Sequence, residues 1–328
     1  LFHSSQYASL PYAPYSDNRL GWIPARSLAT GGEILVPAMA AFMNYTSHSP
    51  EEFFTPITSN GLAAGRTLAN AILSAAGEVL ERDAFMLTWL HRLPTRRYSP
   101  VRHPDPEVVS IASAYARRGV ELRLQQLLPD GFLSVFACLA LEDGEHGPAA
   151  VVGLGTDFDP IRAARQAVLE VCQVRPALRR RMRQPKARIR LEELLRDPHE
   201  VRTIDDHDLL YASAEARPKL DFLLDIEESP FAFEPAADDS AAARLQHLAQ
   251  WLARQGSDLL YVNLTPPDMQ ALGLYTARAI LPQFQPIDFG WIERRLGGRR
   301  LYEYPLGRGL RDRITTIDDL NDDPHPLA

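Results

Sequence analysis

The chain has 328 residues, of which 45% are hydrophobic and 23% are charged, and its formal net charge at pH 7 is −7. A chain of this length and composition can bury a sizeable core, in one large domain or in two ordinary ones. The acidic net charge argues against nucleic acid as a partner. The longest apolar run, from Val135 to Leu141, is far shorter than a membrane-spanning helix, so we expect no membrane segment.

The N-terminus and the two cysteines bear on the origin and location of the protein. The chain begins with Leu1 instead of Met, and its first residues lack the basic region and the apolar stretch of a signal peptide. We therefore expect a fragment or domain whose upstream residues are missing. Cys138 and Cys172 lie in apolar segments, which favours buried thiols in a reducing cytoplasm over a disulfide or a metal pair. A cytoplasmic protein is the expectation.

Apolar periodicity and turn residues define the predicted elements in chain order. We expect a strand hairpin (20–28 and 33–41), two helices (67–90 and 104–118) and three successive strands (120–128, 132–141 and 149–156). A long helix follows, with Asp159 as its N-cap and an end near residue 182. The rest is an irregular stretch with short helical pieces (184–233), a helix (241–254), two strands (259–264 and 276–281) and a polar tail (307–328). Strands and helices mix without strict alternation, which favours an α+β fold over a doubly wound sheet.

Several common catalytic motifs are absent from the sequence. It contains no G-x-x-x-x-G-K-[ST] loop, no H-E-x-x-H pair and no G-x-S-x-G elbow. Gly153-Leu154-Gly155 follows a predicted strand but lacks the third glycine of a dinucleotide-binding turn. The sequence therefore gives no support to a P-loop, a zinc site or a serine nucleophile.

The predicted helix at 67–90 carries three charged side chains on one side. Glu78 is followed at i+3 by Glu81 and at i+4 by Arg82, and apolar residues surround them. Two carboxylates side by side in a partly buried place repel each other unless a cation lies between them, and Mg²⁺ prefers such oxygen ligands. The alternative is a surface cluster of Glu and Arg with an internal salt bridge.

The helix that begins after Asp159 repeats this pattern. Glu170 and Gln173 are again at positions i and i+3, among alanine, valine, leucine and cysteine. Two such helices in one chain suggest a shared site, because Mg²⁺ usually combines a few carboxylates with phosphate oxygens. A solvated polar stripe is the alternative.

A turn rich in small residues lies directly before the first of these helices. It runs from Ser59 through Asn60 and Gly61 to Gly65. Its glycines permit close backbone approach, and a helix N-terminus offers N–H donors and a positive dipole end to a phosphate. The turn is therefore a candidate anion site, with an ordinary loop as the alternative.

Taken together, these three segments resemble the nucleotide-binding pattern of the YcaO family. Their order is Ser59-Asn60-Gly61-x-Ala63-x-Gly65, then Glu78-x-x-Glu81-Arg82, then Glu170-x-x-Gln173. That family uses no Walker loop. The resemblance extends from the hairpin at Leu20 to the end of the chain. It implies one YcaO domain over residues 1–328, with an α+β fold of mixed sheets and packed helices that binds ATP and Mg²⁺ between its sheets.

The resemblance also implies roles for individual residues. Those expected to hold Mg²⁺ are Glu78, Glu81 and Glu170. Those expected to contact the nucleotide are Ser59, Asn60, Gly61, Gly65, Arg82, Gln173 and Arg278. For Arg278, in the predicted strand at 276–281, the alternative is a solvated arginine at a strand edge.

Within the family, the chain most resembles the azoline-forming cyclodehydratases of ribosomally synthesised peptides. This closer resemblance rests on residues 56–65 and on the tail at 320–326. Those enzymes end in P-x-P-x-P, whereas Ala328 stands here in place of the third proline. Pro324 and Pro326 are accordingly expected to help organise the active site, and a disordered polar tail is the alternative.

The implied activity is ATP-dependent cyclodehydration. A Cys, Ser or Thr side chain of a precursor peptide attacks its preceding backbone carbonyl, ATP phosphorylates the oxygen, and phosphate departs to leave a thiazoline or oxazoline. The expected partner is an E1-like or leader-binding protein, and a homodimer is left open. His91 and His325 are candidates for a general base by position alone. The alternatives are a YcaO enzyme that installs a backbone thioamide and a non-catalytic module that binds a peptide.

A basic cluster follows Gln173. Its members are Arg175, Arg179, Arg180, Arg181, Arg183, Lys186, Arg188 and Arg190. A solvated helix end explains such a cluster, because cations suit the C-terminal end of a helix. The functional alternative is a docking site for an acidic leader peptide or partner, and the acidic net charge disfavours nucleic acid.

Overall fold

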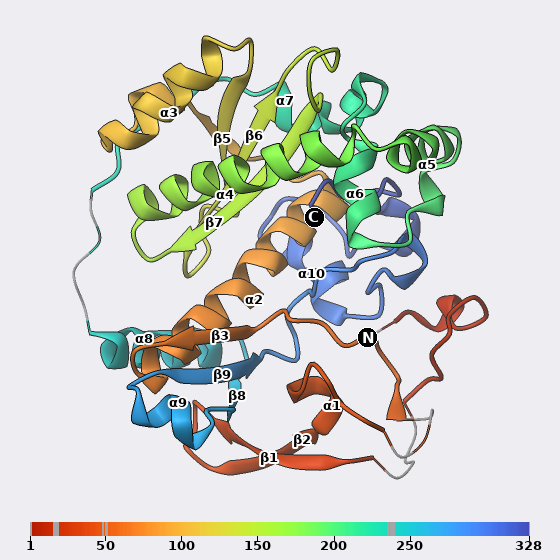
Figure 1. Ribbon diagram of the computed structural model, residues 1–328. Coiled ribbons are helices and arrows are strands. Elements are labelled where there is room, and N and C mark those ends of the chain that lie inside the picture. Colours follow the sequence, from red (N-terminus) through yellow and green to blue (C-terminus); the bar gives the residue numbers. More distant parts are fainter. Residues whose placement is uncertain are drawn as a thin grey trace. The chain divides into compact units, whose positions relative to one another are not determined.

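The computed structural model describes residues 2–15, 20–47, 49, 52–234, 236 and 240–327, and Figure 1 colours its elements along the chain. The chain divides into two compact units. The first unit comprises Leu1–Asp83, Asp238–Ile287 and Arg295–Leu301, and the second comprises Ala84–Ala237, Asp288–Arg294 and Tyr302–Ala328. The boundaries fall within the helices α2 (Leu68–His91) and α10 (Arg299–Gly307), so each of these helices contributes to both units.

The first unit is built on an antiparallel sheet in the order β2-β1-β8-β9-β3. Its strands are β1 (Trp22–Ser27), β2 (Glu33–Pro37), β3 (Leu62–Gly65), β8 (Leu260–Asn263) and β9 (Tyr275–Ile280). Its helices are α1 (Ala38–Ala41), α8 (Ala241–Arg254) and α9 (Pro267–Ala271), with the 3₁₀ turn η1 (Ser4–Gln6) near the N-terminus. Residues 38–41, expected to continue the second strand, instead form the single helical turn α1. The predicted hairpin is confirmed, and its buried side chains Ala25 and Val36 pack with Val262 of β8.

Strand β3 was not predicted. Its sequence, Leu-Ala-Ala-Gly, has little strand propensity, but its main chain pairs with β9 from Leu62 opposite Arg278 to Gly65 opposite Tyr275. Pairing with a neighbouring strand therefore overrides local preference here. One consequence concerns the turn at Ser59 to Gly65, which was expected at the N-terminus of the first long helix. Gly65 is the last residue of β3, and α2 begins only at Leu68.

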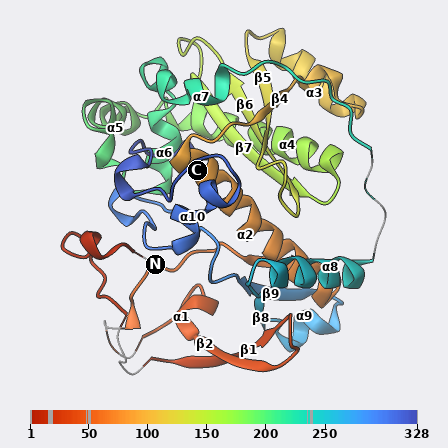
Figure 2. The same cartoon turned by 180° about the vertical axis from the view of Figure 1, so that it is seen from behind.

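The second unit contains a second antiparallel sheet, in the order β4-β5-β6-β7. Its strands are β4 (Arg96–Tyr98), β5 (Glu121–Leu127), β6 (Ser134–Leu141) and β7 (Ala150–Asp157). Its helices are α3 (Pro106–Ala116), α4 (Pro160–Arg181), α5 (Pro185–Arg196), α6 (Ile204–Leu210) and α7 (Asp221–Leu224), with short 3₁₀ turns between them. The three longer strands were predicted, and the short edge strand β4 was not. Figure 2 shows the same elements from behind.

Helix α4 packs along β7 and β6 at short distance (Figure 1). A Cβ atom at Gly155 would lie 2.3 Å from the carbonyl oxygen of Ala163, and one at Gly153 would lie 2.7 Å from the amide nitrogen of Val171. Only glycine fits at such distances. The helix starts as predicted, because the Asp159 carboxylate accepts a hydrogen bond of 2.8 Å from the N–H of Ile161.

The fold confirms the α+β class, with antiparallel sheets and helices in both units. Cys138 lies buried in β6 and Cys172 half-buried in α4, and both are free thiols, as expected. Of the helices in the described residues, none has the length and apolar character needed to span a bilayer.

Candidate active site

Several residues of the first unit form what we call the polar corner: Asn60, Gly61, Glu78, Glu81, Arg82 and Arg278. Gly61 connects its parts. Its φ angle of +86° is in the region that favours glycine, and a Cβ atom there would lie 2.5 Å from the carbonyl oxygen of Ala279. Its N–H donates to the Glu78 carboxylate at 3.0 Å, and its carbonyl accepts from the N–H of Ala279 at 2.8 Å. One glycine thus joins the loop at Ser59–Asn60, strand β9 and helix α2, and it fixes the direction of the Glu78 carboxylate.

The charged side chains of this corner are withdrawn from solvent. Glu81 is 9% exposed, while Glu78 and Arg82 are half-buried. A solvated surface cluster, the alternative considered for these residues, is therefore wrong for Glu81. Burial of a carboxylate in this degree requires partners or a bound cation.

Arg278 lies in β9 between two neighbouring strands, and it is only 7% exposed. The alternative of a solvated arginine at a strand edge is wrong. Its guanidinium donates to the carbonyl oxygen of Thr58 at 2.9 Å. Burial lowers the pKa of the Arg278 guanidinium, and the charge of Glu78 opposes that shift. The carboxylate and the guanidinium therefore stabilise each other's charge within this corner.

Two polar atoms of this corner are buried without a hydrogen-bond partner among the described residues. They are Oδ1 of Asn60 and Nε of Arg278. An orphaned buried group of this kind costs free energy unless a bound molecule or water satisfies it. Phosphate oxygens accept from a guanidinium, and an amide oxygen can accept from a ligand donor or face a cation. The residues of the first unit therefore fit a nucleotide with its metal ion. Ser59 is exposed at the start of the same loop.

The second unit holds Glu170 and Gln173 on α4. The Glu170 carboxylate accepts a hydrogen bond from the N–H of Leu154 in β7, where Gly153 lets the helix approach. Glu170 is half-buried and Gln173, one turn further on, is exposed. Glu170 therefore repeats the arrangement of Glu78, with its carboxylate directed by a main-chain N–H. Leu154 was not predicted as part of this arrangement.

The C-terminal segment is ordered and buried, so the alternative of a disordered polar tail is wrong. Pro324 and Pro326 are both buried within the second unit. Trp89 donates through Nε1 to the carbonyl of Asp323 at 2.9 Å, and the Tyr211 hydroxyl donates to the carbonyl of Pro324 at 2.5 Å. These donors satisfy main-chain carbonyls of a segment in which the prolines, which lack an N–H, prevent regular pairing in a sheet.

His325 and His91 were candidates for a general base. Both are buried, at 2% exposure each. The His325 ring contacts the Asp288 carbonyl at 2.9 Å and accepts from the N–H of Leu327 at 3.3 Å, and it stacks on His207 with ring centroids 3.8 Å apart. His325 is thus engaged in holding the C-terminal segment, which makes it unsuitable as a base that meets substrate.

Sequence comparison assigns the chain to a family. The family model described as "YcaO cyclodehydratase", ATP- and Mg²⁺-binding, matches residues 1–285. The chain belongs to the YcaO family. Its cofactors are accordingly ATP and Mg²⁺. An uncharacterized protein of Methanothermobacter thermautotrophicus is 32% identical over 169 residues, which are 51% of this chain and 44% of that relative.

Solved structures share the fold of this YcaO protein. A heterocyclase in complex with substrate and cofactor is similar over 99% of this chain and 42% of its own, with a TM-score of 0.78 and 24% identity. The YcaO protein of Methanopyrus kandleri bound with AMPPCP and Mg²⁺ matches 84% of this chain and 67% of its own, with a TM-score of 0.59 and 19% identity. In the E. coli microcin synthetase McbBCD complex with pro-MccB17 bound, one chain is similar over 81% of this chain and 64% of its own, with a TM-score of 0.58 and 16% identity. The match covers less than half the length of the M. thermautotrophicus relative and less than half the length of the heterocyclase.

Proposed function

We propose that this YcaO protein is an ATP-dependent cyclodehydratase that forms thiazoline or oxazoline rings at Cys, Ser or Thr of a ribosomal precursor peptide. The observation that carries the proposal is the polar corner of the first unit, where Glu78 and Glu81 are withdrawn from solvent and Arg278 is buried. Such a corner suits a phosphate-bearing ligand with a divalent cation. The fold shared with a heterocyclase supports this choice of reaction.

Each group of residues has a proposed task. Glu78, Glu81 and Glu170 hold Mg²⁺, and the N–H donors of Gly61 and Leu154 orient two of these carboxylates in advance. The residues proposed to contact the nucleotide are Ser59, Asn60, Gly61, Gly65, Arg82, Gln173 and Arg278. Pro324 and Pro326 shape the site through the buried C-terminal segment and touch no substrate.

The chemistry needs positioning more than a protein nucleophile. The peptide's own side chain attacks the preceding carbonyl carbon, and the former carbonyl oxygen is a poor leaving group. When bound with Mg²⁺, ATP would supply the γ-phosphoryl group that turns this oxygen into part of a phosphate leaving group, so that its departure leaves the ring. Arg278 and Arg82 would bind the phosphate charge. A precursor peptide is the proposed substrate, and an E1-like or leader-binding protein is the proposed partner, in line with the peptide-bound microcin synthetase complex.

Incubation of the protein and its partner with a Cys-rich precursor peptide, ATP and Mg²⁺ tests this proposal by mass spectrometry. Loss of one water per ring, dependent on ATP, is the expected result. A mass change equal to exchange of oxygen for sulfur, in the presence of sulfide, would replace it by the thioamide reaction. An unchanged peptide with the partner present would contradict both.

A further inference from the structure

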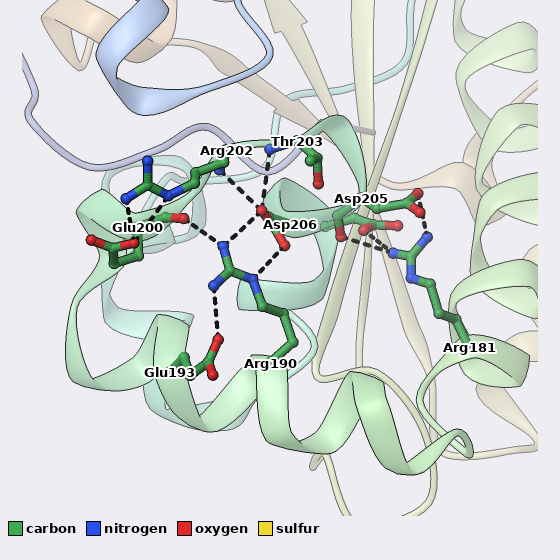
Figure 3. Close-up of polar contacts among 9 residues, drawn as sticks. Arg181, Arg190, Glu193, Glu200, Arg202, Thr203, Asp205 and Asp206 are labelled. Carbon is green, nitrogen blue, oxygen red and sulfur yellow. Dashed lines mark hydrogen bonds and ion pairs between the residues drawn. The ribbon is translucent and has the colours of Figure 1, made fainter. Parts of the chain in front are cut away.

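Three members of the basic cluster that follows Gln173 form ion pairs within the protein. Arg175 pairs with Glu142, Arg181 with Asp205 at 2.8 Å, and Arg190 with Asp206 at 2.9 Å. Arg181 also contacts Asp208, and Arg190 also contacts Glu193. As Figure 3 shows, Arg181 of α4 and Arg190 of α5 bind acidic residues of α6, and Arg190 also donates to the carbonyl of Glu200 before that helix. A solvated helix end therefore does not describe these three residues.

The other five members face solvent. Arg179, Arg180, Arg183, Lys186 and Arg188 are all exposed, and none of them forms an ion pair with another described residue. They line two neighbouring cavities of about 430 and 250 Å³, and Ala187 and Leu209 belong to the walls of both. We call this combined face, formed by the end of α4 and the start of α5, the basic surface.

The helix dipole accounts for only part of the basic surface. Arg179 and Arg180 lie in the last turn of α4, where cations are favourable. Lys186 and Arg188 instead lie in the first turns of α5, where cations are unfavourable, and the first turn contains no acidic residue. Gln184 makes no side-chain cap there. Pro185 has no N–H, and the N–H groups of Ala187 and Arg188 already donate to the Gln184 carbonyl. The start of α5 is therefore marked by repelling positive charges, and a bound anion would relieve that repulsion.

We propose that the basic surface binds an acidic, partly apolar segment of peptide. Carboxylates would pair with the five free cations, and apolar side chains would contact Met182, Leu191 and Leu209, which line the same cavities. Nucleic acid fits less well, because no Phe, Tyr or Trp lines the cavities to stack on a base. The identification of this segment with the leader of the precursor peptide rests on the proposed function.

Fluorescence anisotropy with a labelled peptide of repeated Glu-Leu-Glu-Ala units tests the basic surface directly. The test variant is Lys186→Glu/Arg188→Glu. The control is Arg26→Glu/Arg254→Glu, which makes the same change of net charge at exposed positions elsewhere. We expect the test variant to bind the peptide about tenfold more weakly or worse, with the control close to wild type and the affinity of wild type falling with added salt. The melting temperature of the test variant should stay equal or rise, because acidic residues suit the start of α5.

The outcomes are separable from those of the proposed function, because this binding needs neither ATP nor chemistry. Equal affinity of the test variant and wild type would overturn the proposal. So would tighter binding of a thymidine oligonucleotide than of the acidic peptide, which would point to a nucleic-acid surface. Peptide binding that is lost in the test variant, together with a precursor that is never dehydrated, would keep the basic surface and reject the cyclodehydratase.

Discussion

Two regions of the molecule direct a glutamate in the same way and differ in almost everything else. In the first unit, Glu78 of α2 accepts an N–H from Gly61, which lies in a left-handed turn before β3. In the second unit, Glu170 of α4 accepts an N–H from Leu154, inside a regular strand. The first arrangement needs one glycine with a positive φ angle. The second needs glycines in a strand so that a helix can approach it.

The two regions also differ in what surrounds the glutamate. The first contains a buried arginine and buried polar atoms without partners in the described structure, whereas α4 rests on β7 through alanine, valine and glycine. A polar corner of this kind lowers stability unless a ligand satisfies its buried groups, while close packing fixes position and contributes to the core. Substitutions should therefore separate function from stability differently in the two regions.

The largest expected effect is the loss of turnover in Glu78→Gln and in Glu170→Gln. Each glutamine keeps the shape of the side chain, and its amide oxygen can still accept the main-chain N–H. Removal of a metal-ligand charge should lower peptide-dependent ATP turnover about a hundredfold or more, with unfolding free energy within ~1 kcal/mol of wild type. Turnover and melting temperature are measured on the same samples. Exposed Glu107→Gln is the control, and full turnover in either test variant would remove that glutamate from the metal site.

The next largest effect is a loss of stability, which we expect from a substitution where α4 packs on β7. Gly155→Val places a Cβ atom 2.3 Å from the Ala163 carbonyl and 2.4 Å from the Ala167 amide nitrogen. Because these are main-chain atoms, α4 must move, and we expect a loss of about 3 kcal/mol in unfolding free energy. Gly307→Ala, which meets nothing within 4 Å, is the matched control. Denaturant unfolding that shows equal stability for the two variants would contradict close packing of α4 on β7.

The second unit should also respond to pH through His207. Burial lowers the pKa of His207 to about 4, against 6.5 for the free side chain. The unfolded state then binds more protons between these values, so stability is full above pH 6.5 and falls as the pH drops to 4. The loss would be roughly 3 kcal/mol. His207→Gln should lack this part of the pH dependence.

Asp208, next to His207, also contributes to the pH dependence of stability. Burial raises the pKa of Asp208 to about 6 despite Arg181, which favours the folded state at low pH and opposes the effect of His207. Only the difference between wild type and His207→Gln is therefore diagnostic, because Asp208 contributes to both. Parallel curves of unfolding free energy against pH would show that His207 is not buried in its neutral form.

The sequence predicted most of the regular structure and the glutamates of both regions. Glu78, Glu81 and Arg82 lie on the predicted helix, and Glu170 lies on a helix whose N-cap, Asp159, was also predicted. Spacing reveals such features because it is local. Strand β3 was missed since its pairing with β9 is distant in sequence.

The C-terminal segment shows what composition cannot reveal. Its polar and proline residues are typical of an exposed tail, yet Trp89, Tyr211 and His207 supply hydrogen-bond partners for its carbonyls. Those partners lie more than a hundred residues away. The role of Gly153 and Gly155 could have been found from the sequence, because two glycines in a predicted strand beside an alanine-rich helix indicate close packing.

The central claim is that this chain binds ATP together with Mg²⁺ through its glutamates. Calorimetric titration of the protein with ATP, in Mg²⁺ and again in excess EDTA, tests it most directly. We expect binding in Mg²⁺ that is lost in EDTA, and weak binding under both conditions for Glu78→Gln. Equal ATP affinity with and without Mg²⁺, or no binding by a folded protein in either condition, would contradict the account.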